Sequence, residues 1–96
     1  MADERISIEV FCLHQQVETT FVHALYERGL IQFEEEPPHQ YIAREHLPRL
    51  EQLARLHYDL EIDLAGIEAI SHLLERLQGM QEEMREMRER LRLYER

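Results

Sequence analysis

The feature that most constrains this sequence is an apolar repeat in its last third. Apolar residues recur there at steps of three and four, at Ile67, Ile70, Leu74 and Leu77 and again at Met80, Met84, Met87, Leu91 and Tyr94. These are the steps of the a and d positions of a coiled coil. The repeat therefore predicts one helix from about Leu64 to the end of the chain, about 45 Å long. The step from Leu77 to Met80 is three where four is due, and this slip in register falls at Gln78-Gly79.

The outer half of such a helix is too long for residues 1–63 to cover. Left alone, its Met and Leu side chains would form an exposed apolar patch. We therefore expect a homodimer, formed through Ile70, Leu74, Leu77, Met80, Met84, Met87 and Leu91. The charged residues beside these positions allow the two helices of the dimer to run antiparallel or parallel. Glu83 can face Arg90 of an antiparallel partner or Arg88 of a parallel one. A solvated helix that packs on its own head is the alternative.

Residues 1–63 are predicted to form a mainly α head with a small β wing. The alternation of Ile6 and Ile8 with polar residues indicates a short entry strand. Two short helices follow, and the tight connector between them at Gln15–Val17 matches the dimensions of a helix-turn-helix. Gly29 is expected to end the second helix, because glycine adopts positive φ most easily. That helix has an apolar face of Phe21, Val22, Leu25 and Tyr26.

The wing and a third helix are expected next. Leu30–Phe33 and Tyr41–Ile42 are short, apolar and β-prone, so they predict the two wing strands. The acidic stretch Glu34–Gln40 holds two prolines and predicts the loop between them. The third helix should start near Glu45, with Pro48 in its first turn. Its predicted apolar face consists of Leu47, Leu50, Leu53, Ala54, Leu56, His57 and Leu60.

The charge of the chain is negative and uneven. The chain has 20 Asp and Glu against 11 arginines and no lysine, a net charge of −9. Residues 33–63 alone hold eight carboxylates against three arginines. DNA-binding proteins draw most of their non-specific affinity from Lys and Arg beside phosphates. We therefore expect no nucleic-acid partner for this chain.

The sequence predicts no enzyme, no cofactor and no metal site. Its single cysteine, Cys12, excludes a disulfide within the chain and any multi-cysteine metal site, and it is expected to be a small buried side chain. The six histidines show no H-x-x-x-H spacing. No run of 18 apolar residues and no secretory signal occurs, so we expect a cytoplasmic protein without a membrane span.

Three short motifs resemble a known family. They are Phe11-Cys12-Leu13-His14, Gly29-Leu30-Ile31 and Leu64-Ala65-Gly66-Ile67, the last of which opens the long final helix. On these motifs, and on its length and acidity, essentially the whole chain resembles the chaperone-modulator CbpM family. That family is a branch of the MerR-like winged helix-turn-helix proteins. The resemblance implies a MerR-like head at residues 1–63 and a dimerisation helix, antiparallel as in MerR-like dimers, at residues 64–96.

The sequence departs from the DNA-binding MerR pattern at the residues that read DNA. His23, Ala24 and Leu25 stand where DNA-binding members carry an arginine and two aromatic residues. Gln16 replaces the usual glycine of the turn. The wing tip carries Glu34–Glu36 where a DNA-binding wing carries arginine, and carboxylates there would repel phosphates.

The resemblance implies a non-enzymatic protein that binds the J-domain of a DnaJ-like co-chaperone of the CbpA type and blocks its engagement of DnaK. Such J-domains expose a basic helix, so an acidic partner gains steering and specificity. By charge, we expect the contacts at Glu34, Glu35, Glu36, Glu45 and Glu27, with Tyr41 as an aromatic neighbour. A dimeric MerR-type transcription regulator that still binds DNA is the alternative, and a dimerisation adaptor with an unrelated partner is a third possibility.

Overall fold

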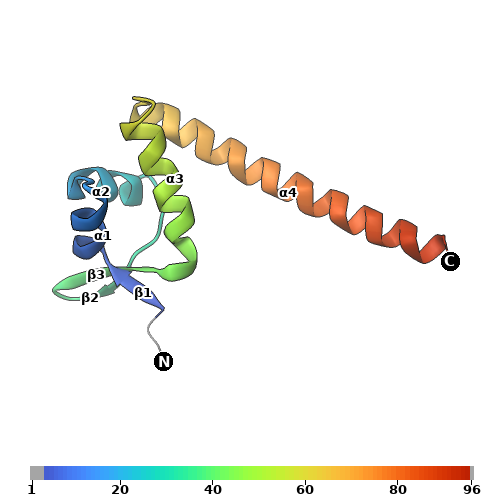
Figure 1. Cartoon of the computed structure of the whole chain (residues 1–96), viewed down its shortest axis with the longest axis horizontal. Coiled ribbons are helices and arrows are strands. Elements are labelled where there is room, and N and C mark those ends of the chain that lie inside the picture. Colours follow the sequence, from blue (N-terminus) through green and yellow to red (C-terminus); the bar gives the residue numbers. More distant parts are fainter. Residues whose placement is uncertain (1–3, 96) are drawn as a thin grey trace.

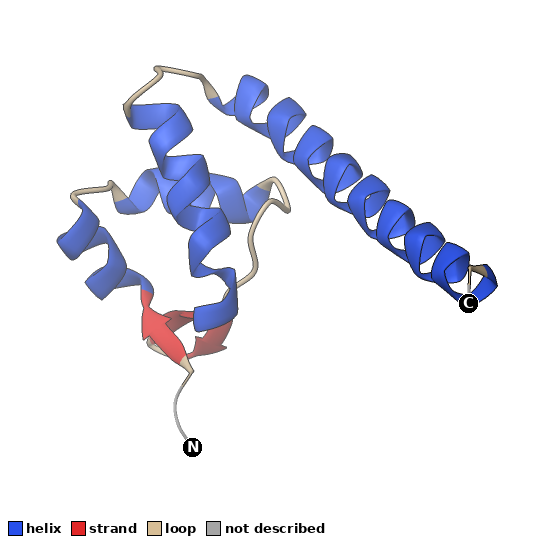
Figure 2. Cartoon of the chain, turned by 45° about the vertical axis from the view of Figure 1, so that its right-hand side comes forward, coloured by secondary structure: helices blue, strands red, loops and turns tan. Residues whose placement is uncertain are grey.

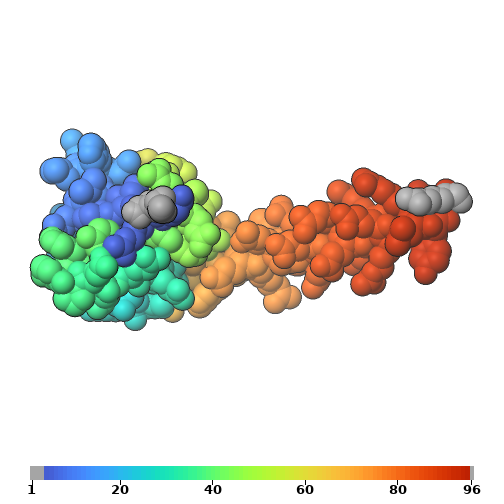
Figure 3. All heavy atoms as spheres, turned by 90° about the horizontal axis from the view of Figure 1, so that it is seen from below, coloured from blue at the N-terminus to red at the C-terminus, as the bar shows by residue number. Residues whose placement is uncertain are grey.

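Three helices and a small sheet pack around one apolar core, and a fourth, much longer helix leaves that core (Figure 1). The computed structural model describes residues 4–95. The described chain measures 56 × 37 × 21 Å, and the long helix α4 sets the longest of these dimensions (Figure 3). The MerR-like winged head followed by a long C-terminal helix, as predicted from the sequence, is confirmed.

The first two helices form the helix-turn-helix. Strand β1 (Arg5–Ser7) leads directly into α1 (Ile8–Gln15), whose first turn is capped by Ser7 Oγ accepting from the Val10 N–H at 3.4 Å. Gln16 follows with φ of 56°, the left-handed conformation that a turn glycine would adopt more easily. Helix α2 (Thr19–Glu27) ends before Gly29, which has φ of 77°, as the sequence predicted.

The first wing strand lies later in the sequence than predicted, while the second contains the predicted Tyr41–Ile42. The strands are β2 (Glu34–Glu36) and β3 (His39–Ala43), so the segment that was expected to be the loop contains one strand and the first two residues of the other. Leu30–Phe33 is not a strand, because Leu30 and Ile31 both enter the core and successive residues of a strand would point to opposite faces. The turn of the wing is Pro37-Pro38 alone.

The sheet is antiparallel with the order β1-β3-β2. Ile6 pairs with Ile42 across β1 and β3, while Glu35 pairs with Gln40 across β2 and β3. Glutamate is uncommon in strands, but β2 is an edge strand with exposed side chains, where charge is well tolerated. The sheet and the α3–α4 connection lie at opposite ends of the head (Figure 2).

Helix α3 (Leu47–Tyr58) starts with Pro48 in its first turn and is preceded by a 3₁₀ turn at Arg44–His46. Its buried face consists of Leu50, Leu53 and Ala54. The prediction that Leu60 belongs to this apolar face is wrong, because the helix ends at Tyr58 and the Leu60 side chain is 64 % exposed.

Helix α4 (Leu64–Tyr94) is attached to the head only by its first turns. Asp63 Oδ1 caps it by accepting from the Gly66 N–H at 2.9 Å. Ile67 and Ser71 are fully buried against the head, and Arg28 at the end of α2 forms an ion pair with Glu68 at 3.0 Å. Within residues 4–95, no helix has both the length and the apolar character that a bilayer span requires.

Two glycines give stability predictions of opposite sign. A Cβ at Gly29 or at Gly79 would meet no atom within 4 Å, so only backbone conformation decides the effect of alanine. Gly29→Ala places a side chain at positive φ and should lower the free energy of unfolding by about 1–2 kcal/mol. Gly79→Ala lies inside α4 and should stabilise the helix by up to about 1 kcal/mol. Urea unfolding followed by circular dichroism measures both changes in the free energy of unfolding. If the two variants were both stabilised or both destabilised, the assignment of Gly29 to the turn would be contradicted.

Candidate interaction surfaces

Strand β2 divides the three wing glutamates between two faces. Glu34 and Glu36 are two residues apart, so they point to one face of the sheet, and Glu35 points to the other. The three predicted contacts therefore lie on two different surfaces of the wing, because adjacent residues of a strand do not share one.

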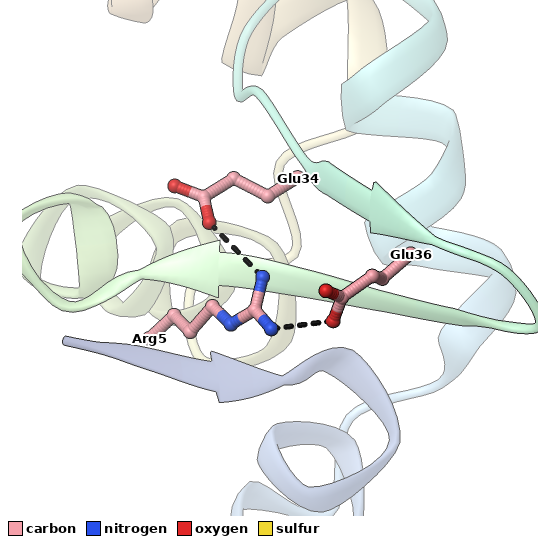
Figure 4. A network of polar contacts seen from close by, with 3 residues as sticks. All are labelled: Arg5, Glu34 and Glu36. Carbon is pink, nitrogen blue, oxygen red and sulfur yellow. Dashed lines mark hydrogen bonds and ion pairs between the residues drawn. The ribbon is translucent and has the colours of Figure 1, made fainter. Parts of the chain in front are cut away.

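Arg5 occupies the face of Glu34 and Glu36. Its guanidinium group reaches across β3 from β1, with Nη1 3.5 Å from Glu34 Oε1 and Nη2 2.6 Å from Glu36 Oε1 (Figure 4). The guanidinium carbon also lies 4.0 Å from the centre of the Tyr41 ring, a cation–π geometry. The hydrogen bond to Glu36 is the main cause that raises the pKa of Arg5 above its ordinary value. We call this surface, made of Arg5, Glu34, Glu36 and Tyr41, the Arg5 face.

The opposite face joins the wing to α2 through a chain of hydrogen bonds. Gln40 Nε2 donates to Glu35 Oε2 at 3.4 Å, and Gln40 Oε1 is hydrogen-bonded to His23 Nε2 at 2.7 Å. His23 Nδ1 is in turn 3.0 Å from the carbonyl oxygen of Thr19, one turn earlier in α2. His23 therefore fixes the wing to the helix.

Aromatic rings continue this face along α2. Tyr26 and Phe33 stack with their ring centres 4.4 Å apart, and His23 meets Phe33 edge-on at 5.6 Å. Tyr26 stays 38 % exposed in this stack. Glu27 follows His23 by one helical turn and is exposed. The surface formed by His23, Tyr26, Glu27, Phe33, Glu35 and Gln40 is called the α2 face below.

Glu45, the remaining predicted contact, belongs to neither face. It lies in the 3₁₀ turn before α3, where its carboxylate is 3.7 Å from His46 Nε2. It lines a cleft of about 800 Å³ that the turn after α2, helix α3 and helix α4 enclose. Arg49, Arg55 and Glu75 line the same cleft. Sequence reasoning did not predict this cleft, since it arises only from the angle at which α4 leaves α3.

The predicted dimer seam falls into two parts. Ile70 and Leu74 are partly buried and lie on the side of α4 that carries the fully buried Ile67 and Ser71. The rest of the seam is half-exposed or more along the bare outer half of the helix (Figure 3), at Leu77, Met80, Met84, Met87 and Leu91. An α-helix turns by about 100° per residue. The apolar side chains from Met80 onward are therefore rotated about the helix axis by about 120° from those that meet the head. A second helix on the outer stripe would therefore leave the contacts between α4 and the head in place.

The groups most able to carry chemistry have structural roles. Cys12 is buried, and burial raises the pKa of its thiol, so the reactive thiolate is disfavoured at neutral pH. His57 stacks on Phe21 with ring centres 4.4 Å apart and donates from Nδ1 to the Ile62 carbonyl oxygen at 2.9 Å. In the part of the chain that the structure describes, no three His, Cys, Asp or Glu side chains are grouped closely enough to hold a metal ion.

The comparisons with known proteins decide the family. A profile described as MerR HTH family regulatory protein matches residues 6–89, which include the winged head and most of α4. The chain belongs to the MerR HTH family. Neither the search of curated proteins nor the search of solved structures found a significant match. Membership in this family means a regulatory helix-turn-helix domain, which is a binding fold rather than a catalytic one. It does not separate DNA-binding members from the chaperone-modulator branch.

Proposed function

We propose that this MerR-family protein binds the J-domain of a DnaJ-like co-chaperone of the CbpA type and blocks that domain from engaging DnaK. The observation that carries the proposal is the chemistry of the wing and α2, the two elements with which a winged helix-turn-helix reads DNA. Both carry carboxylates on their exposed side, at Glu27, Glu34, Glu35 and Glu36. The resemblance of three sequence motifs to the chaperone-modulator family supplies the class of partner.

Two arginines near this region, Arg5 and Arg28, are occupied by internal contacts. Arg5 is held by two wing glutamates, and Arg28 is held by Glu68 of α4. Phosphate contacts need free cations, and a protein that neutralises few phosphates binds DNA weakly. A basic helix has the opposite requirement, because exposed carboxylates steer it toward the surface and favour its correct orientation. The charge of this region therefore favours a basic protein partner over DNA.

Removing the charge of the wing should weaken J-domain binding without unfolding the head. The triple variant Glu34→Gln, Glu35→Gln, Glu36→Gln changes only exposed side chains, so packing is retained. We expect a slower association rate and a flatter dependence of affinity on salt, since exposed charges are screened beyond about 8–10 Å. Stopped-flow binding and titration calorimetry with a purified J-domain of the host measure both quantities.

A second triple variant controls for net charge. Glu82→Gln, Glu86→Gln and Glu89→Gln remove the same charge from exposed positions of α4 that lie outside the apolar stripe. This control should bind like the wild type. Equal losses in the two triple variants would mean that overall charge, and not the wing, governs binding. No binding of the wild type to any J-domain of its host would overturn the proposed function.

A dimeric DNA-binding transcription regulator is the second candidate, and family membership is consistent with it. The two candidates differ in a simple measurement. Because carboxylates occupy the wing and the exposed face of α2, we expect no sequence-dependent binding of duplex DNA at physiological salt. A mobility-shift assay against a genomic fragment library tests this, and sub-micromolar, sequence-dependent shifts would replace the J-domain proposal with the regulator.

We also propose that the protein acts as a homodimer through the outer half of α4. Five half-exposed apolar side chains on one helix face, at Leu77, Met80, Met84, Met87 and Leu91, form a stripe that water solvates poorly. Their steps of three and four fit a two-stranded coiled coil, in which each side chain packs into a hole of the facing helix.

Truncation after Gln78 should leave a monomer with a folded head, because Met80, Met84, Met87 and Leu91 are removed. A point variant gives the same test with less disturbance. Met87→Glu places a carboxylate in the stripe and should also give a monomer, while Leu93→Glu makes the same change at an exposed apolar residue outside it and should stay dimeric. Light scattering at tens of micromolar measures the mass, and a monomeric wild type would show that the stripe is not a dimer seam.

A further inference from the structure

We propose that the basic helix of the partner docks on the α2 face of the head, between Tyr26 and Glu35, and not on the Arg5 face. This inference rests on the proposed function and specifies where on the acidic region the contact is made. It depends on how the described side chains divide the carboxylates of the wing between two faces, and on what lies beside each group.

The Arg5 face presents a cation to any approaching partner. The guanidinium group of Arg5 lies between Glu34 and Glu36 and over Tyr41, so both carboxylates already have a charged hydrogen-bond partner. A lysine or arginine of the partner would have to compete with Arg5 for the same oxygen atoms. It would also approach a like charge at close range, which is unfavourable.

The α2 face has carboxylates without an ion-pair partner. Neither Glu27 nor Glu35 forms an ion pair with any residue in the described part of the chain. The Glu35 carboxylate accepts one neutral hydrogen bond from Gln40, which leaves lone pairs for a second donor. A basic partner therefore gains two new ion pairs on this face without breaking an existing one.

The aromatic stack gives the α2 face a second kind of contact. The Tyr26 ring, 38 % exposed and stacked on Phe33, lies on the same face as the two carboxylates. Exposed aromatic rings bind arginine and lysine by cation–π attraction, and they also cover the aliphatic stems of these side chains. An amphipathic basic helix carries both features, so the chemistry of this face matches that class of ligand.

The surface is also fixed in shape before binding. His23 connects the carbonyl of Thr19 to Gln40, and Gln40 connects to Glu35, so the wing and α2 are held at one distance. A surface whose side chains are already ordered loses less conformational entropy when a partner binds. The cleft beside α3 and α4 is less suitable for a basic helix, because Arg49 and Arg55 line it.

Single substitutions at 0.15 M salt or above test the inference with the full-length protein and a purified J-domain. At this salt concentration each charge acts mainly on groups within about 8 Å. A substitution on one face therefore reports on binding at that face alone. Glu35→Gln and Glu27→Gln should each raise the dissociation constant about threefold or more. Glu36→Gln, an equal change of charge on the Arg5 face, should change it less than about twofold.

The aromatic contact has its own matched pair. Tyr26→Phe keeps the ring and should bind like the wild type, while Tyr26→Leu removes it and should weaken binding. Circular dichroism and urea unfolding check that each variant is folded, and Glu27→Gln tests the same face without touching the stack. The inference is wrong, while the proposed function stands, in either of two cases. In one, Glu36→Gln weakens binding as much as Glu35→Gln does; in the other, neither Glu35→Gln nor Glu27→Gln weakens binding. A wild type that binds no J-domain overturns both.

Discussion

The structure depends on one small core in which α2, β3, α3 and α4 meet. Leu25, Ile42, Leu50, Leu53 and Ile67 come from these four elements, and each is fully buried. A core of this size leaves little freedom, because shifting any one element would expose its buried side chain to water or leave a cavity. The position of the wing relative to α2, and the direction in which α4 leaves the head, both follow from this packing.

That packing places an exposed helix and an acidic edge strand beside one another, as in a protein that reads DNA, but their charge is reversed. Hydrogen bonds link Thr19 to His23, His23 to Gln40 and Gln40 to Glu35. They join α2 to the wing, two elements that contact phosphates in a DNA-binding protein of this fold. Fold alone does not determine function, and here the side chains on a regulatory scaffold argue for a basic protein ligand. The outer half of α4 adds a separate apolar surface, so the proposed partner site and the proposed dimer seam lie on different parts of the chain.

The sequence predicted the helix-turn-helix, the existence of a wing and the long last helix, because each has a strong local cause. Periodic apolar residues define α4, and the positive φ of Gly29 ends α2. The first wing strand was placed wrongly, because glutamate and proline are poor strand residues and only pairing with β3 makes Glu34–Glu36 an edge strand. The division of the acidic residues could not be predicted either, since Arg5 lies about 30 positions before the glutamates it binds.

The central claim is that the DNA-reading face of a MerR-type head has become a docking surface for a basic protein helix. Amide resonances of the ¹⁵N-labelled full-length protein, followed while a purified J-domain is added, test this most directly. The account predicts that the largest shifts fall on residues 23–27, 33–36 and 39–40, with those of Met80–Leu91 unchanged. Shifts confined to α4 or to the cleft beside α3, or none at a saturating concentration of the J-domain, would contradict it.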